Sequence, residues 1–403
     1  MNTWLSDFGA LFCGICGSPA EWIPLSALLF FCLAQCVIYL TVFNGIPRWN
    51  KRLMQGKMPI QDNLSPVTII VTANNQLKNL EANLHALLEQ DYPEFQVVVV
   101  DVASFDGTCD FLHALESQYP HLYHTFVPAD VQNISLKKMA LTIGVKAAKY
   151  DYLLFTDADC KPAGNQWVKH MMRHFVPGNE LVLGYKTYAC KGFWERLLVT
   201  YANLFQSMRF LGMAAKRKTF MGDGQNLAYK KDLFFVHKGY ASQLNIHPGE
   251  DDIFVAKTAN KSNTRVEVSP ESVVTVFSEN AFNRWWNDHY NRLQTMAYYS
   301  FSAKMFVQFE WISRISFYLL LAGLIFFSSL RGNYLLMSLS GILFFLRAII
   351  QISVFQRCSK VLNERRFFFS IPFLDIIMPP MTIFLYLQGL LQNRSSNTRQ
   401  KIH

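Results

Sequence analysis

The chain has 403 residues, of which 51% are hydrophobic and only 17% are charged, and its formal net charge is +9. Soluble proteins carry about 25% charged residues, so this composition excludes an ordinary soluble enzyme. The middle of the chain has no basic stripe interleaved with aromatic residues, which argues against a nucleic-acid partner. Much of the positive charge instead flanks long apolar runs, as it does in cytoplasmic loops beside a membrane.

The first predicted element is a membrane anchor at residues 24–43. Its sequence, PLSALLFFCLAQCVIYLTVF, is uncharged and long enough to cross a hydrocarbon core of about 30 Å. The preceding tail, residues 1–23, contains no Lys or Arg, whereas Arg48, Lys51 and Arg52 follow the run. The charge rule therefore places the tail outside the cytoplasm and residues 44–300, including any interfacial helices, inside it.

The region after the anchor alternates short apolar strands with helical segments. Strands are expected at residues 67–72, 95–101 and 152–157, and a helix between the first two has one leucine face, formed by Leu80, Leu84, Leu87 and Leu88. Such alternation predicts a parallel sheet built from βαβ units. Ligands bind at the carboxyl ends of the strands in sheets of this kind.

Two carboxylates, Asp157 and Asp159, follow directly after the expected strand at 152–157, in the sequence LLFTDADCKP. Side chains near a strand terminus can reach the same crevice. Mg²⁺ and similar hard cations take oxygen ligands, often one or two carboxylates plus substrate phosphates. The pair therefore indicates a divalent metal site, and the alternative is a simple turn or helix cap.

A series of further motifs resembles family 2 glycosyltransferases, in family order over about residues 65–275. The opening segment, PVTIIVTANNQLKNLEANLHALLEQDYPEFQVVVVDVASFDGT, is followed by KKMAL at 137–141, the Asp-Ala-Asp triplet, FMGDGQNLAY at 220–229, GEDD at 249–252 and SPES at 269–272. The resemblance implies a GT-A-like (Rossmann-like) nucleotide-sugar-binding domain of the α/β class. With the apolar runs, it implies a membrane-anchored enzyme of bacterial type.

The resemblance also implies roles for individual residues. Nucleotide-sugar-binding positions would be Thr72, Asn75, Asp101, Lys138 and Asp157, with Lys138 near the base or the phosphates. Asp159 is the expected direct ligand of an Mg or Mn cation, with Asp157 beside it. Asp251 corresponds to the catalytic base of the family, a role that needs a carboxylate within hydrogen-bond reach of the acceptor hydroxyl. Glu250 is expected to orient it, although a helix N-terminus also favours such acids.

The sequence departs from the family pattern at several positions. Val102 stands where a second Asp commonly recognises the base, and Gln76 stands where an acid is common. These changes leave the nucleotide open, with a UDP-sugar favoured. The stretch beginning at Trp285 lacks the Gln-x-x-Arg-Trp motif of processive members, although Arg292 in it could contact phosphate. We therefore expect transfer of one or a few sugars.

The C-terminal part predicts a membrane region of two or three spans at residues 311–391. Arg347 and Asp375 lie inside its apolar stretches and should face the protein interior, although Arg347 could instead snorkel. Pro379 and Pro380 could kink the last stretch or make it a re-entrant hairpin. A full last span would place the basic tail, residues 392–403, outside against the charge rule, and a hairpin would keep it inside.

Other patterns have structural interpretations. His170 and His174 lack the acid of a zinc-protease motif, so we expect a solvated helix face. The segment 193–213 is apolar at helical spacing, which favours core packing over an interfacial helix. The family resemblance implies that Gly222 and Gly224 form a flexible loop near the acceptor. Aromatic residues before the C-terminal spans are typical of a membrane-interface belt; they are Trp285, Trp286, Tyr290, Tyr298, Tyr299 and Trp311.

Taken together, the sequence predicts an inverting, metal-dependent glycosyltransferase in the inner or plasma membrane. It would pass a sugar from a nucleotide-sugar donor to a membrane-associated acceptor, most simply a lipid-linked one, and would bind no nucleic acid. A processive polysaccharide synthase is one alternative. A catalytically silent scaffold in a glycan-assembly complex is another, motivated by Val102 and by the altered stretch around Arg292.

Overall fold

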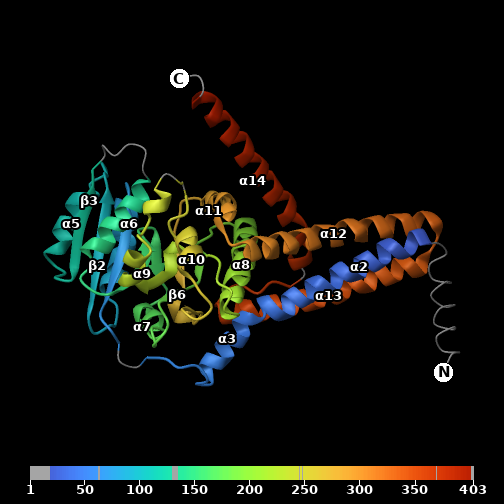
Figure 1. Ribbon diagram of the computed structural model, residues 1–403, viewed down its shortest axis with the longest axis horizontal. Helices are drawn as coiled ribbons and strands as arrows, with labels where there is room; N and C mark the ends of the chain where they lie inside the picture. The colour runs from blue at the N-terminus through green and yellow to red at the C-terminus, as the bar shows by residue number, and fades with distance from the viewer. Residues whose placement is uncertain are drawn as a thin grey trace.

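The computed structural model describes residues 19–61, 64–128, 135–244, 246, 248–368 and 370–400. Most of the predicted tail 1–23 lies outside the described residues, as do the side chains of the basic tail 392–403. The chain forms an α/β domain and a bundle of long helices that extends from one side of it (Figure 1).

The centre of the α/β domain is a mixed sheet of 7 strands in the order β3-β2-β1-β4-β8-β6-β9. Its strands are β1 (Val67–Ala73), β2 (Phe95–Val102), β3 (Leu122–Val127), β4 (Tyr152–Asp157), β6 (Leu181–Leu183), β8 (Leu227–Lys230) and β9 (Thr264–Val266). Strands β1 to β4 run parallel, whereas β8 is antiparallel to β4. A sheet of 3 strands joins β5 (Cys160–Pro162), β10 (Val274–Val276) and β7 (Lys186–Tyr188).

Helices cover both faces of the sheet, as the alternating pattern predicts. They are α4 (Leu77–Leu88), α5 (Thr108–Glu116), α6 (Leu136–Ala147), α7 (Trp167–Met172), α9 (Lys231–Val236) and α10 (Asp252–Thr258). The predicted leucine face of α4 is buried, and the three predicted strands appear as β1, β2 and β4. Helix α6 approaches the sheet closely at Gly144, where an added Cβ would lie 2.7 Å from Ile70 Cγ2.

The register of the parallel strands brings their polar ends together. Thr72 pairs with Asp157 across β1 and β4, and Ala73 pairs with Asp101 across β1 and β2. In this order, β2 and β3 lie on one side of β1 and β4 lies on the other side, so the strand order reverses at β1. This strand order creates a crevice at the carboxyl ends, which is where α/β sheets bind ligands.

The bundle contains helices long and apolar enough to cross a membrane. They are α2 (Pro19–Ile38) with the π-helical turn η1 (Tyr39–Phe43) and α3 (Gly45–Met54), then α12 (Phe301–Arg331), α13 (Tyr334–Val361) and α14 (Ser370–Gln400). Among the described residues, length and composition give 4 candidate spans: Glu21–Met54, Phe301–Arg331, Tyr334–Val361 and Ser370–Gln388. In Figure 1, α2, α12 and α13 lie side by side, whereas α14 leaves this bundle at an angle.

Charged residues of the apolar stretches meet inside the protein, as expected. Arg347 and Asp375 are 1% and 0% exposed, and Arg347 Nη2 lies 2.8 Å from Asp375 Oδ2. Arg314 Nη1 approaches the other oxygen of Asp375 at 3.3 Å, and the Tyr318 hydroxyl donates to Asp375 at 2.7 Å. Arg347 therefore does not snorkel, because a buried partner from α14 neutralises it. The same contacts fix the start of α14 against α12 and α13.

Helices α8 (Phe193–Ala215) and α11 (Ala281–Thr295) lie between the α/β domain and the bundle (Figure 1). Nearly all of α8 from Leu197 to Ala214 is buried, so the core interpretation of this apolar segment is confirmed. The predicted aromatic belt is wrong in part. Trp285 and Tyr299 are 2% and 5% exposed because they pack into the core of the α/β domain.

The expected solvated face at His170 and His174 is also wrong for His174, which is fully buried after the end of α7. Its Nε2 lies 2.8 Å from Glu267 Oε2, and Arg173 binds the same carboxylate at 2.7 Å. Glu267 therefore compensates the burial of His174, and the pair links α7 to the segment that follows β9.

Candidate active site

A cavity of about 380 Å³ opens at the carboxyl ends of β1, β2 and β4. Thr72 comes from β1, Val102 from β2 and Asp157 from β4, while Lys137 on α6 and Arg284 on α11 close the remaining sides. Gln76 and Asp159 also line this cavity. It is called the donor cavity below, because Asp157 and Asp159, the two acids predicted to hold the metal, lie in it.

Asp157 ends β4, and Asp159 follows it after Ala158. The Arg284 guanidinium lies 3.5 Å from Asp157 and 3.2 Å from Asp159. Burial opposes the charge of Asp157, but Lys137 and Arg284 outweigh it and hold its pKa below the ordinary value. Burial raises the pKa of Asp159, and its proximity to Asp157 adds to the effect. Both carboxylates therefore converge on one cationic group.

The same arrangement suits a divalent cation. One cationic group already lies within reach of both carboxylates, and their oxygens are the hard ligands that Mg²⁺ and Mn²⁺ prefer. Two protein carboxylates leave coordination positions for phosphate oxygens of a substrate. Among the described residues, the set of three clustered metal-ligating side chains lies elsewhere, at His113, Glu116 and His124. The donor cavity thus fits a cation that is shared with a phosphorylated ligand.

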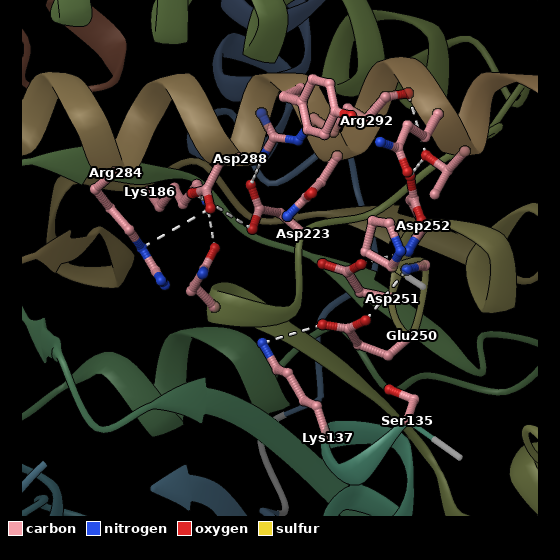
Figure 2. Close-up of a pocket in the computed structure, with 17 residues that line it drawn as sticks. Ser135, Lys137, Lys186, Asp223, Glu250, Asp251, Asp252, Arg284, Asp288 and Arg292 are labelled. Carbon is pink, nitrogen blue, oxygen red and sulfur yellow. Dashed lines mark hydrogen bonds and ion pairs between the residues drawn. The ribbon is translucent and has the colours of Figure 1, made fainter. Parts of the chain in front are cut away.

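A second cavity, of about 480 Å³, adjoins the first. Figure 2 shows α11 crossing one side of it with Arg284, Asp288 and Arg292, while Glu250, Asp251 and Asp252 line another. Lys137 and Arg284 line both cavities. The second cavity is called the acceptor cavity below, because the predicted base, Asp251, faces it.

Asp251 immediately precedes α10 and is held by backbone N–H groups. Gly224 N donates to its Oδ2 at 2.6 Å, and Asp252 N donates to its Oδ1 at 2.8 Å. Burial, assisted by the neighbouring acids Asp252 and Glu250, raises the pKa of Asp251 to about 7. A carboxyl with a pKa near the working pH is suited to accept a proton in a general-base step.

Glu250 has a different environment although it precedes Asp251 in the chain. Burial would raise its pKa, but the Lys137 ammonium at 3.1 Å and a backbone hydrogen bond together keep the pKa below the ordinary value. Lys137 also lies 3.3 Å from Asp157. Lys137 therefore bridges Asp157 of the donor cavity and Glu250 of the acceptor cavity. Glu250 remains charged, whereas Asp251 can take up a proton.

Asp252 anchors the same segment to α11 and to the loop after it. Its Oδ2 accepts hydrogen bonds from the Thr295 and Tyr299 hydroxyls, the latter at 2.9 Å. Burial raises the pKa of Asp252 to about 6. At neutral pH the Asp252 carboxylate is therefore charged, and this charge helps to raise the pKa of the adjacent Asp251.

A network of ion pairs forms the wall of the acceptor cavity opposite Glu250 and Asp251. Lys186 lies 3.1 Å from Asp223 and 3.0 Å from Asp288, and Arg292 pairs with the other oxygen of Asp223. Arg284, Asp288 and Arg292 recur every four residues, so they project from one face of α11. This spacing holds α11 against the loop that carries Gly224.

The other predicted site residues lie outside the donor cavity's lining. Asn75 has a left-handed backbone (φ 52°), and its side-chain oxygen accepts a hydrogen bond from Phe105 N at 2.9 Å. Asp101 is the second-last residue of β2, and its carboxylate accepts a hydrogen bond from the Ser104 hydroxyl. Both side chains thus connect the loops after β1 and β2.

Lys138 is fully buried and points away from the cavities. Its ammonium donates to the carbonyl oxygens of Gln243, at 2.9 Å, Ile246 and Pro248. It holds the segment that leads to Glu250, and Lys137 is the lysine that reaches the carboxylates. The structure therefore corrects the expected position of Lys138 near the phosphates.

Sequence reasoning also missed Arg284. The signal was present, because Arg284 and Trp285 match the last two positions of Gln-x-x-Arg-Trp, with Ala281 in place of Gln. The motif is therefore reduced rather than missing. The loop with Gly222 and Gly224, predicted to be flexible, makes a specific contact, because the Gly224 N–H donates to the Asp251 carboxylate. Arg292 pairs with Asp223 and does not lie between the acids of the donor cavity.

Comparison with known proteins agrees with this fold. Residues 68–235 match the model of the family described as glycosyl transferase family 2. A similar solved structure is the mannosyltransferase PcManGT from Pyrobaculum calidifontis in complex with GDP-Man and Mn²⁺. The superposition covers 83% of this chain and 99% of PcManGT, with 18% sequence identity and a TM-score of 0.51. At this identity the likeness establishes the fold, which is GT-A-like.

Two curated relatives match shorter regions. Poly-beta-1,6-N-acetyl-D-glucosamine synthase of Staphylococcus aureus is 26% identical over 98 residues, which are 24% of this chain and 23% of the relative. Ceramide glucosyltransferase of Komagataella phaffii is 24% identical over 151 residues, 36% of this chain and 28% of the relative. The match thus spans about a quarter of the length of these relatives.

Proposed function

We propose that this chain is a membrane-anchored, metal-dependent, inverting glycosyltransferase, because residues 68–235 match the family model described as glycosyl transferase family 2 and the fold is GT-A-like. Its donor is a nucleotide-activated sugar, and UDP-sugars are the first to test. GDP-sugars are the alternative, because the matching mannosyltransferase was solved with GDP-Man. Its acceptor is membrane-associated and lipid-linked.

One observation carries this proposal: the two cavities meet at Lys137 and Arg284. The acids suited to a metal and a diphosphate lie in one cavity, and the acid suited to a base lies in the other. A displacement at a sugar carbon needs a leaving group on one side of that carbon and a nucleophile on the other. Joined cavities with this division of groups support such a geometry.

In the proposed reaction, an acceptor hydroxyl oxygen forms a bond to the anomeric carbon while the bond from that carbon to the diphosphate oxygen breaks. The hydroxyl proton passes to the Asp251 carboxylate. Attack opposite the leaving group inverts the configuration at the anomeric carbon. Gly224 N and Asp252 N hold the two oxygens of Asp251, so the base enters the reaction already oriented.

The leaving diphosphate takes the electrons of the broken bond and needs positive charge near it. Asp157 and Asp159 would hold an Mg²⁺ or Mn²⁺ cation, which supplies Lewis-acid stabilisation of the diphosphate when bound. Lys137 and Arg284 lie at the junction of the cavities, where they can bind phosphate oxygens once the donor competes for them. Arginine is suited to this because its planar fork matches phosphate oxygens.

The position of the bundle supports a membrane-bound acceptor. Helix α11, which carries Arg284 and Arg292, contacts α8 and α14 beside the candidate spans (Figure 1). The acceptor cavity is thus built from a helix that adjoins the bundle. We place the catalytic domain in the cytoplasm, because Arg48, Lys51 and Arg52 follow the first span.

We further propose that α14 does not cross the membrane beside the other spans. It leaves the bundle formed by α2, α12 and α13 and packs against α11 and α8 (Figure 1). Asp375 near its start is held by Arg347 and Arg314. A helix at the membrane surface would keep the basic tail 392–403 on the cytoplasmic side, as the charge rule requires. Labelling of a single cysteine added at the C-terminus with an impermeant reagent, in intact cells and in inverted vesicles, tests this placement.

The function is tested with the detergent-purified full chain, Mg²⁺ or Mn²⁺ and a panel of UDP- and GDP-sugars, with native membrane extract as the acceptor source. We expect metal-dependent turnover of one donor, and its loss in Asp159→Ala and Asp251→Asn. Asp232→Asn, on the exposed side of α9, is the matched control and should keep full activity. A folded protein that turns over no donor would support the silent scaffold.

A processive polysaccharide synthase is the second candidate, favoured by the similarity to poly-beta-1,6-N-acetyl-D-glucosamine synthase. The reduced motif at Ala281–Trp285 argues for short products instead. Chromatography of the labelled product distinguishes the two, because a processive enzyme gives long chains even when the acceptor is in excess.

A further inference from the structure

A third cavity lies where the α/β domain joins the bundle, away from the carboxylates described above. Its volume is about 390 Å³, and its walls come from the C-terminal end of α8, the turn before β9, the π-helical turn η1 and the first turns of α12. Val42 belongs to the first candidate span and Phe306 to the second. The cavity is therefore bordered by both spans at their ends nearest the catalytic domain.

This cavity is strongly basic. Lys216, Arg217, Lys218 and Lys261 line it, and all four are exposed. No acid of the described part of the chain forms an ion pair with any of them, unlike the cations of the acceptor cavity, which are all paired. Four unneutralised cations at one opening attract a ligand of multiple negative charge.

Polar groups inside the cavity are also those that bind an anion. The Thr219 hydroxyl is buried without a hydrogen-bond partner, although a buried hydroxyl normally has one. Ser300 caps the 31-residue helix α12, and Ser302 lies in its first turn. The first turn of a helix presents free N–H groups and a positive dipole end, which together bind phosphate.

The remaining wall is apolar, with Val42, Met213, Phe220 and Phe306 facing the same space. A free anion in water would gain nothing from this surface. A ligand with a charged headgroup and a hydrocarbon chain would use both parts. On the outside of α12, Phe301, Met305 and Phe309 are exposed, as expected of a surface in contact with lipid.

We propose that this cavity binds the phosphate headgroup of a membrane lipid. Lys216, Lys218 and the Thr219 hydroxyl contact the phosphate, and the acyl or prenyl chain continues along α12 into the bilayer. The inference rests on the proposed membrane placement of the bundle, and it does not depend on the identity of the sugar donor.

A short series of side-chain contacts joins this cavity to the acceptor cavity. The ring of Phe220, which lines it, lies 5.5 Å from the ring of Tyr299, and the Tyr299 hydroxyl donates to Asp252 at 2.9 Å. Phe220 and Arg292 also line one small cavity between the two. A lipid held here would lie on the acceptor side of the site, next to the residues that support Asp251.

The test is lipid binding to the full chain in detergent, measured by native mass spectrometry. The probes are phosphatidylglycerol, a polyprenyl phosphate, phosphatidylcholine and inorganic phosphate. We expect retained adducts of one or both anionic lipids and weaker binding of phosphatidylcholine. Preference for phosphatidylglycerol would identify a structural lipid, and preference for the polyprenyl phosphate would identify an acceptor lipid. Equal binding of all lipids, or of inorganic phosphate alone, would overturn the proposal.

Substitutions in the cavity wall test whether the lipid binds in this cavity. Each cation beside an anionic lipid strengthens binding about five-fold, so Lys216→Gln with Lys218→Gln should weaken it about 25-fold. Lys51→Gln with Arg52→Gln, an equal loss of exposed charge on α3, is the control and should leave adducts unchanged. Thr219→Val should weaken binding about ten-fold without a change of charge. Equal losses in both double variants would show a diffuse surface effect and would refute the cavity.

The readouts also separate this proposal from the proposed function. Asp251→Asn should bind lipid as the unmodified chain does, even though it transfers no sugar. Lys216→Arg with Lys218→Arg should keep both folding and binding, which controls for a double variant that fails to fold.

Discussion

The raised pKa of Asp251 predicts an unusual pH dependence for the transfer reaction. Burial and the acids beside it raise this pKa from 3.8 to about 7. Since one pKa unit corresponds to about 1.4 kcal/mol, charging Asp251 in the folded protein costs about 4 kcal/mol more than in water. A general base works only when deprotonated, so kcat/KM for the donor should rise with pH and level off above an apparent pKa near 7.

The neighbour Asp252 provides the perturbation. Its charge is the largest cause of the raised pKa after burial. Asp252→Asn removes that charge and keeps an oxygen that can accept the hydrogen bond from Tyr299. The acid limb should therefore move to lower pH by about one unit, the scale on which a nearby like charge acts. Asp232→Asn, an exposed acid on α9, should leave the profile unchanged.

The assay is the initial rate of sugar transfer from pH 5 to pH 9 at fixed free metal concentration, with donor binding measured separately at each pH. A flat profile down to pH 5 in the unmodified chain would refute a raised pKa at the base. An unchanged limb in an active Asp252→Asn would refute the electrostatic explanation. The sign for stability is opposite to that for activity: the folded state binds this proton more tightly, so the contribution of Asp251 to stability is full below about pH 4 and is lost as pH rises through about 7.

Three further predictions concern single side chains. Arg284→Ala removes the guanidinium between the acids of the donor cavity and should lower kcat about 100-fold at saturating metal, with partial recovery in Arg284→Lys measured by steady-state transfer. Asp375→Asn leaves Arg347 unneutralised in the bundle and should destabilise the protein by about 3 kcal/mol or more; thermal unfolding in detergent checks this, and Arg347→Met with Asp375→Leu should be less harmful. Gly144→Ala should cost about 1–3 kcal/mol in denaturant unfolding, because the new Cβ would lie 2.7 Å from Ile70 Cγ2; an unchanged midpoint would contradict the close packing of α6.

Much of the fold follows from the sequence, because its elements are encoded in local patterns. The apolar runs at β1, β2 and β4 and the leucine face of α4 appear where periodicity predicts them. Parallel strands must end at one edge of the sheet, so Asp157 and Asp159 could be assigned to a shared crevice before any contact was known. The long uncharged runs likewise predicted helices that can cross a membrane. Strand β3 (Leu122–Val127) escaped prediction because only its ends are buried.

Only the tertiary structure decided which neighbours in sequence face the site. Lys137 and Lys138 are adjacent on α6, and the rotation of that helix on the sheet turns one toward Asp157 and the other toward the carbonyl of Gln243. In the same way, the orientation of α11 sends Arg284 to the acids and Trp285 into the core. Periodicity specifies that a helix has faces, but what each face meets is decided by packing between segments far apart in the chain.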